Sequence, residues 1–334
     1  MAMVDWQKQY GDRFRGCRAL VTGGAGFIGS HLTEALVHLG ADVVVLDDLS
    51  GSDENNLDDA RAANTLEFVK GSIIDVPTVA SCIEGCRFVF HLGALPSVPR
   101  SVEQPGLFQL VNVTGTHNLL EASRQASVQR VMFAASSSAY GDVPTLPKIE
   151  SMEPQPKSPY AANKLAGEHM MRAYASSYEI DTVSLRYFNI FGPRQNTNST
   201  YAGVIAAFAK AMINDQQPLI YGDGEQSRDF TYVANAVHAN LLAAQSEKPI
   251  HGSVLNIGCG VRVTINNLAR QMAEALDKPH LTPRYQPART GDVLHSLAGL
   301  DRSGQTINYA PIVDFPAGLQ ATLKWYETAR PWTK

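Results

Sequence analysis

A glycine-rich loop near the start of the chain constrains the fold more than any other feature of the sequence. The loop, Gly23 to Gly29, lies between an apolar strand-like run at residues 18–22 and a helical stretch at residues 30–37. Glycines at this spacing permit a tight turn, let the backbone approach a pyrophosphate and allow a helix to pack closely on a strand. The helix N-terminus adds the positive end of its dipole. This stretch therefore predicts a strand, turn and helix that bind a dinucleotide.

An aspartate after the next strand-like run indicates which dinucleotide is bound. Residues 42–46 form that run and lead directly into Asp47. A carboxylate about 20 residues past the loop accepts hydrogen bonds from the ribose hydroxyls of adenosine. A 2′-phosphate would instead require an arginine, and none follows directly. Asp47 therefore favours NAD over NADP as the cofactor.

Strand-like and helical stretches alternate beyond this point, which is typical of a parallel sheet covered on both faces. The expected strands are residues 18–22, 42–46, 66–69, 88–92, 131–134 and 182–186, with a further strand at 254–257 that returns to the sheet. The prediction is an α/β Rossmann fold with a doubly wound parallel sheet. A second, discontinuous domain is expected beyond Phe188, because the regular pattern breaks there. The predicted nucleotide-binding domain comprises residues 1–187 plus about 229–258, and the predicted substrate domain comprises about 188–228 plus 259–334.

Tyr160 and Lys164 lie four residues apart in a stretch of helical composition, so their side chains share one helix face. A free tyrosine has a pKa near 10, and bringing it to neutrality needs about 4 kcal/mol of differential stabilisation. One ammonium rarely supplies that much, whereas a second positive charge, such as an oxidised nicotinamide ring, would complete the shift. The pair therefore predicts a general base beside the dinucleotide.

A serine cluster, Ser136 to Ser138, follows the fifth expected strand. Ligands of open α/β sheets bind at the carboxyl ends of the strands, so these hydroxyls are expected near the mouth of the cofactor site. A hydroxyl beside a Tyr–Lys base can share and relay the proton of a substrate alcohol.

Composition limits the other classes of function. The chain has 334 residues, 44% of them hydrophobic, and can bury a sizeable core. Its net charge of −4 offers no electrostatic case for nucleic acid or an anionic membrane. Neither a signal peptide nor an apolar run of about 18 residues is expected. The four cysteines, Cys17, Cys82, Cys86 and Cys259, show neither metal-ligand nor CxxC spacing. We therefore expect no metal site, and we expect reduced thiols in a cytoplasmic protein.

These motifs resemble the extended short-chain dehydrogenase/reductase family, in particular its NAD-dependent nucleotide-sugar epimerases and dehydratases. The resemblance runs end to end, with motifs at residues 22–29, 71–75, 91–94, 186–194, 222–224, 228–230 and 291–293. It implies that the catalytic residues are Ser136, Tyr160 and Lys164. It implies that NAD is held by Gly23, Gly26, Phe27, Ile28, Gly29, Asp47, Ile74, Asp75, Leu92, Ala94, Asn112, Tyr160, Lys164 and Tyr187. It implies that a UDP-sugar is held by Ser97, Ser137, Ser138, Asn189, Val204, Tyr221, Arg228, Arg289, Asp292 and Ser296.

The two residues after Ser136 bear on the reaction. Related dehydratases and decarboxylases carry an acidic pair there, because eliminating water or handling a carboxylated intermediate needs further acid/base groups. This chain has Ser137 and Ser138 instead. The minimal cycle is then oxidation at C4, rotation of the 4-keto sugar and return of the hydride to its other face, which is 4-epimerisation.

The sugar is indicated by Ser296. Glucose-specific members commonly carry a bulky tyrosine at this position, beside the sugar C2, whereas a serine leaves room for an N-acetyl group. The surrounding segments resemble bacterial UDP-N-acetylglucosamine 4-epimerases of surface-polysaccharide pathways. UDP-glucuronate 4-epimerases tend to carry an arginine where Pro99 stands, although Arg100 is adjacent. Gly93 and Gly299 depart from the Ala and Asp that are more usual in the family, so local packing there is expected to differ.

Other readings stay open at the level of the sequence. UDP-glucuronate 4-epimerisation, dehydration or C4 reduction are alternatives on the same scaffold, since one fold hosts several reactions. A non-catalytic nucleotide-binding protein is an alternative of another class. The resemblance also implies a homodimer through helices near residues 111–126 and 160–178, although their apolar residues could equally belong to the core.

Overall fold

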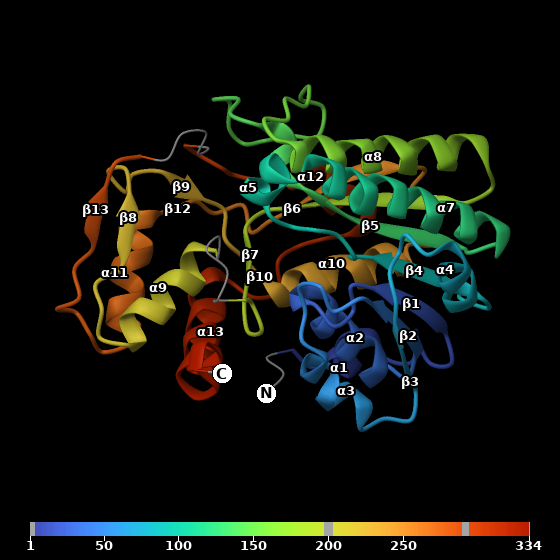
Figure 1. Cartoon of the computed structure of the whole chain (residues 1–334), viewed down its shortest axis with the longest axis horizontal. Coiled ribbons are helices and arrows are strands. Elements are labelled where there is room, and N and C mark those ends of the chain that lie inside the picture. Colours follow the sequence, from blue (N-terminus) through green and yellow to red (C-terminus); the bar gives the residue numbers. More distant parts are fainter. Residues whose placement is uncertain (1–3, 197–202, 289–293, 334) are drawn as a thin grey trace.

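A seven-stranded parallel sheet forms the centre of the larger lobe of the computed structural model, which describes residues 4–196, 203–288 and 294–333 (Figure 1). The strand order is β11-β6-β5-β4-β1-β2-β3, and every neighbouring pair is parallel. The strands are β1 (Arg18–Thr22), β2 (Asp42–Asp47), β3 (Leu66–Lys70), β4 (Phe88–His91), β5 (Arg130–Ser136), β6 (Asp181–Tyr187) and β11 (Ser253–Ile257). The predicted α/β Rossmann fold is confirmed, including the strand that returns to the sheet after a long excursion.

The strands are buried on both faces, which explains their nearly continuous apolar sequences. In β2, Val43 and Val45 join the hydrophobic cluster on one face, whereas Val44 and Leu46 join the cluster on the other. The same alternation holds in β1 and β4. Side chains that alternate between two buried faces require a layer of helices on each side of the sheet.

Two layers of helices meet this requirement. One face is covered by α4 (Val76–Ile83), α7 (Gly115–Gln125) and α8 (Pro159–Ser177), and the other by α2 (Phe27–His38) and α10 (Val233–Gln245). Helix α2 starts at Phe27, earlier than the predicted Ser30, with Gly26 as its N-cap. Helix α8 contains both Tyr160 and Lys164, as predicted, and begins where the Ser158 hydroxyl accepts from the Ala161 amide.

A second core forms the smaller lobe at the left of Figure 1, around α9 (Val204–Ile213), α11 (Ile265–Ala275) and α13 (Phe315–Ala329). The chain enters this lobe from the carboxyl end of β6 through β7 (Ile190–Phe191). Phe191 packs against Phe230 and Phe315 with ring centroids 6.3 and 5.7 Å apart. The short strands here are β8 (Leu219–Tyr221), β9 (Ser227–Arg228), β10 (Thr231–Tyr232), β12 (Val263–Thr264) and β13 (Arg284–Gln286). The domain boundaries drawn from the sequence stay a prediction.

The remaining elements are short and connect the two lobes or cover their edges. They are α1 (Trp6–Tyr10), η1 (Glu54–Leu57), α3 (Asp58–Arg61), α5 (Val98–Glu103), α6 (Pro105–Gln109), η2 (Leu110–Thr114), η3 (Ser137–Tyr140), α12 (Asp301–Ile307) and η4 (Pro331–Thr333). None of the helices in the described ranges combines the length and apolarity needed to cross a membrane.

Candidate active site

The glycine loop is packed so tightly at Gly23 and Gly29 that a side chain is excluded at each of these two positions. Gly23 has a φ of +68°, and a Cβ there would lie 2.8 Å from the Gly93 Cα. A Cβ on Gly29 would lie 2.0 Å from the Gly23 carbonyl oxygen. No side chain of the described residues caps the N-terminus of α2 at Gly26. A cradle of bare backbone facing an uncapped helix end fits a pyrophosphate, as the sequence predicts for this loop.

Asp47 lies at the carboxyl end of β2 and is 7% exposed. One carboxylate oxygen accepts from the Ala25 amide at 3.0 Å. The other accepts from the Leu49 amide at 2.9 Å and from the Ser52 hydroxyl at 2.7 Å. A carboxylate offers about four acceptor positions, so three are occupied here. Asp47 therefore holds the glycine loop in place through Ala25. Its binding of the adenosine ribose stays a prediction.

The other residues that the resemblance assigns to NAD follow neighbouring strands. Ile74 and Asp75 follow β3 and are exposed, and the Asp75 carboxylate accepts from the Thr78 hydroxyl at 2.6 Å. Asn112, in η2, donates to the Leu95 carbonyl oxygen at 3.1 Å and accepts from the Leu95 amide at 2.8 Å. The remaining ones lie at strand or helix ends around the same sheet edge: Phe27 and Ile28 in α2, Leu92 and Ala94 after β4, and Tyr187 at the end of β6.

A buried histidine that the sequence analysis left without a role joins the two sides of this edge. The Thr116 hydroxyl donates to the Asn112 carbonyl oxygen at 2.7 Å, so it must accept from Nε2 of His91, 2.9 Å away. Nδ1 of His91 then accepts from the Thr22 hydroxyl at 2.8 Å, and that oxygen accepts from the Gly93 amide at 3.1 Å. Burial lowers the pKa of His91 to about 3, in keeping with this neutral tautomer. His91 thus links the glycine-loop strand to the segment after β4.

The three residues predicted to be catalytic come from strand β5 and from helix α8, which packs against it. Ser136 ends β5, and its hydroxyl accepts from the Ser138 hydroxyl at 2.8 Å. Tyr160 lies in the first turn of α8, where its amide donates to the Ser101 hydroxyl of α5 at 3.1 Å. Lys164, one turn further, is 4% exposed and donates to the Ala134 carbonyl oxygen at 2.8 Å. The fold therefore brings a phenol, an ammonium and a hydroxyl to one edge of the sheet.

The pKa values of Tyr160 and Lys164 in this structure do not by themselves make the Tyr160 phenol a base at neutral pH. Burial raises the pKa of Tyr160 above its ordinary value, and a hydrogen bond with Ser136 opposes the rise. Burial lowers the pKa of Lys164 to about 8, while the Glu168 carboxylate opposes that change. The chain alone therefore leaves the phenol protonated at neutral pH, and a further positive charge is needed beside it.

Residues predicted to hold the UDP-sugar meet around β9. Arg228 donates from Nη1 to the carbonyl oxygens of Ser227 and Leu294 at 3.0 and 3.2 Å. The Ser296 amide donates to the Ser227 carbonyl oxygen at 3.1 Å, and Ser296 is 8% exposed. The segment after residue 293 therefore lies against β9, which brings Arg228 and Ser296 together from 68 residues apart in the chain.

Asp229 is a second residue that the sequence analysis left without a role. Its carboxylate is fully buried and accepts from the amides of Cys259, Gly260 and Ala298 at 2.8, 3.0 and 3.0 Å. Burial raises its pKa to about 6, against the pull of these three amides. The Asp229 carbonyl oxygen also accepts from Asn189 at 3.4 Å. Asp229 thus joins Asn189 to the segment that contains Ser296.

The other residues predicted to bind the substrate lie on several different elements. Ser97 caps the N-terminus of α5, Ser137 and Ser138 begin η3 after Ser136, Tyr221 ends β8, and Val204 begins α9. Arg289 and Asp292 lie outside the described residues.

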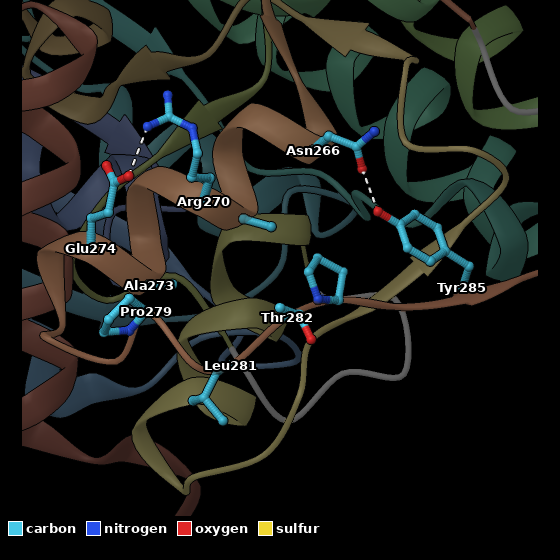
Figure 2. A pocket seen from close by; sticks show the side chains of 10 residues that line it. Asn266, Arg270, Ala273, Glu274, Pro279, Leu281, Thr282 and Tyr285 are labelled. Carbon is cyan, nitrogen blue, oxygen red and sulfur yellow. Dashed lines mark hydrogen bonds and ion pairs between the residues drawn. The ribbon is translucent and has the colours of Figure 1, made fainter.

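A pocket of about 210 Å³ opens elsewhere, between α11 and residues 279–285 (Figure 2). The Tyr285 hydroxyl donates to Asn266 at 3.0 Å, and Arg270 pairs with Glu274 at 2.8 Å. Figure 2 shows both contacts as dashed lines. Of the residues predicted for catalysis or binding, none within the described ranges lines this pocket. The candidate site is therefore located by its polar side chains at the sheet edge.

Comparison with known proteins identifies the family of the chain. A model of the family described as NAD dependent epimerase/dehydratase matches residues 19–258. The chain belongs to the NAD-dependent epimerase/dehydratase family. This match spans the glycine loop, Asp47 and the Ser136, Tyr160 and Lys164 group.

Relatives of this epimerase/dehydratase family member carry out more than one reaction. It is 37% identical over 311 residues to a UDP-glucose 4-epimerase of Mycolicibacterium smegmatis, covering 92% of this chain and 98% of that protein. It is 32% identical over 324 residues to a dTDP-glucose 4,6-dehydratase of an Actinoplanes species, covering 94% and 99%. A solved UDP-N-acetylglucosamine 4-epimerase from Methanobrevibacter ruminantium M1, in complex with UDP-N-acetylmuramic acid, superposes with a TM-score of 0.90 at 38% identity, covering 94% of this chain and 99% of that one.

The structure explains why glycine stands at two positions where this family member departs from the expected pattern. A Cβ on Gly93 would lie 3.1 Å from the Thr22 hydroxyl, within the His91 network. A Cβ on Gly299 would lie 2.8 Å from the Ile149 side chain, and the Gly299 amide donates to the Lys148 carbonyl oxygen at 2.8 Å. Both glycines permit close approach of two segments that border the site.

Proposed function

We propose that the protein is a UDP-sugar 4-epimerase that uses NAD, with UDP-N-acetylglucosamine and UDP-N-acetylgalactosamine as its preferred pair of substrates. The observation that carries the proposal is the group at the sheet edge: Ser136, Tyr160 and Lys164 converge, while Ser137 and Ser138 occupy the positions where the related dehydratases carry acids. The similarity to a UDP-glucose 4-epimerase and to a UDP-N-acetylglucosamine 4-epimerase supports the same reaction class.

The residues of the chain have distinct tasks in this reaction. Tyr160 takes the proton from the C4 hydroxyl of the sugar and later returns it, while Ser136 shares that proton and orients the hydroxyl. Lys164 favours the phenolate by its charge. Bound NAD supplies a hydride acceptor and donor at C4, and its positive ring supplies the charge that the chain lacks. Arg228, placed by two carbonyl oxygens, is suited to the diphosphate.

The preference for N-acetylated sugars rests on the wall formed by Ser296. A small side chain there, held against β9 by its own amide, leaves the space beside the sugar C2 open. UDP-glucuronate is less favoured as a substrate, because Pro99 stands where UDP-glucuronate 4-epimerases tend to carry an arginine. The neighbouring Arg100 lies in α5 with its side chain exposed. Dehydration is less favoured, because no acid follows Ser136.

The experiment is direct. The purified protein is incubated with UDP-GlcNAc, UDP-Glc or UDP-GlcA, and the sugars are separated after hydrolysis. We expect GalNAc from the first substrate, with a higher kcat/KM than for Gal from the second, and no 4-keto-6-deoxy product. A keto product would contradict epimerisation, and faster conversion of UDP-Glc or UDP-GlcA would contradict the proposed sugar.

A further prediction concerns cofactor choice. NAD is expected to bind at least about tenfold more tightly than NADP, because a 2′-phosphate would meet the Asp47 carboxylate with like charge, and charges about 4 Å apart near a surface repel by roughly 4 kcal/mol. Titration calorimetry measures both dissociation constants. Ser52→Ala is the matched control: it removes a hydrogen bond to Asp47 without changing charge, so it should weaken both cofactors alike. Equal affinities in the parent protein would contradict the role of Asp47.

We propose that the active form is a homodimer. Exposed apolar side chains occur on α5, α6 and η2, before α7, and at the end of α8: they are Val98, Val102, Leu107, Leu110 and Tyr178. A surface of this kind is suited to a self-complementary contact. Light scattering of the purified protein would give twice the mass of the chain, and a monomeric mass would overturn this.

A further inference from the structure

Arg186 and Glu168 form an ion pair in the interior, between β6 and α8. Arg186 Nε and Nη2 donate to the two carboxylate oxygens of Glu168 at 2.8 and 2.7 Å. The two side chains are 3% and 4% exposed. Both oxygens of the carboxylate are thus bound by one guanidinium, in the bidentate geometry that arginine favours.

Packing alone gives no reason for this ion pair. Two well-packed apolar side chains often stabilise a protein as much as a buried ion pair does. Arg186 also has a buried nitrogen, Nη1, without a hydrogen-bond partner in the described part of the chain. An unmade hydrogen bond in the interior is unfavourable. The pair therefore calls for a role other than stability.

The position of Glu168 relative to Lys164 indicates that role. The two residues lie four apart in α8, so their side chains are neighbours on one helix face. The Lys164 ammonium nevertheless donates to the Ala134 carbonyl oxygen and lies 4.9 Å from the centre of the Phe133 ring. In a buried site an unpaired carboxylate one turn away would pair with this ammonium.

Resting on the proposed function, we propose that Arg186 is a positioning residue for the Tyr160–Lys164 base, because by binding Glu168 it keeps the Lys164 ammonium available to Tyr160. Arg186 is itself held by Tyr140, whose ring centre lies 4.6 Å from the guanidinium carbon. The Tyr140 hydroxyl donates to the Asn256 side chain at 2.7 Å.

Few other groups can act on Lys164. Glu168 acts on the Lys164 ammonium from the same helix, and Lys164 in turn acts on the neutral His91 of β4. Arg186 of β6 is connected to Lys164 through Glu168, and Tyr140 of η3 lies against Arg186. The charged groups of α5 and α7 lie toward the surface; they are Arg100, Glu103, Glu121 and Arg124. At the opposite end of β5 and β6, Arg130 pairs with Asp181. Among the charged groups of the described residues, Glu168 is therefore the one that acts on Lys164, and Arg186 is the group that binds Glu168.

The test separates the two halves of the pair. Arg186→Met leaves Glu168 free to pair with Lys164, so the apparent pKa at which the Tyr160–Lys164 base is deprotonated should rise by about one pH unit. Glu168→Gln leaves the Arg186 charge unopposed, so the same pKa should fall by a similar amount, again about one unit. The double variant should return it to the parental value.

Two measurements report this pKa. One is the acid limb of the kcat profile against pH. The other is the ¹³C NMR titration of ring-labelled tyrosine in the full chain without substrate, with the Tyr160 signal assigned by Tyr160→Phe. The second needs no epimerase activity, so failure of the proposed function would not be mistaken for failure of this inference.

The matched control is the buried pair at the far end of the same strands. Arg130→Met breaks an ion pair whose side chains are 4% and 13% exposed, and it should lower stability without moving the Tyr160 titration. If Arg186→Met does not fold, Arg186→Lys replaces it and should shift the pKa in the same direction by less. Shifts of the same sign in the two single variants, or an unchanged titration, would overturn the inference.

Discussion

Replacing Tyr160 by phenylalanine is expected to lower kcat by about two to four orders of magnitude, which is the usual worth of a positioned acid/base group. In the proposed reaction the phenol takes the proton from the sugar, and Tyr160 lies in the first turn of α8, where its amide donates to Ser101. The glycine loop and Asp47 lie on other elements, so NAD should still bind. Rates of UDP-sugar conversion and the cofactor content of the purified protein measure the two effects.

The control for this variant removes a hydroxyl elsewhere. Tyr285→Phe deletes the hydrogen bond to Asn266 at the pocket of Figure 2 and should leave kcat unchanged. Because Tyr160 is buried and its pKa is raised, the parental rate should also fall steeply toward acid pH. A Tyr160→Phe variant that keeps activity within about tenfold of the parent would show that another group is the base.

Replacing Ser296 by tyrosine is expected to abolish most activity on N-acetylated sugars. Ser296 is 8% exposed and its backbone is tied to β9. In the proposed function this residue borders the sugar C2, so a larger side chain would enter the space that an N-acetyl group needs. A steric clash discriminates more strongly than a missing methylene, which is worth about 1–3 kcal/mol, so kcat/KM for UDP-GlcNAc should fall by more than about 100-fold. UDP-Glc, whose C2 hydroxyl is smaller, should be spared.

Activity on UDP-Glc is the internal control for folding of this variant. Ser296→Ala is the matched control, because it removes the hydroxyl while keeping the space, and it should leave the preference for N-acetylated sugars intact. If both classes of substrate lose activity together in the folded Ser296→Tyr protein, Ser296 does not set the width of the site. The proposed substrate pair would then lose its main physical support.

Much of the fold could be predicted because its signals are local. Each strand shows as a short apolar run. The glycine loop and Asp47 lie about 20 residues apart, and Tyr160 and Lys164 lie four residues apart, so each motif can be recognised within a short window. Helix α2 began three residues earlier than expected, since Gly26 and Gly29 look like loop residues although a helix N-terminus can begin among them. The sequence predicted which residues form the base but not the pKa of Tyr160, because burial raises this pKa and burial follows from packing.

The sequence by itself determined the class of fold, the cofactor loop and the chemical groups of the candidate site, because periodicity and spacing follow from the geometry of a single strand or helix. Only the tertiary structure decided which distant residues hold those groups. Glu168 meets Arg186 across α8 and β6, His91 bridges Thr22 and Thr116, and Asp229 binds Ala298. These partners share no local pattern, since their contact depends on the order in which the crossovers place the strands and on how the second lobe folds back onto them.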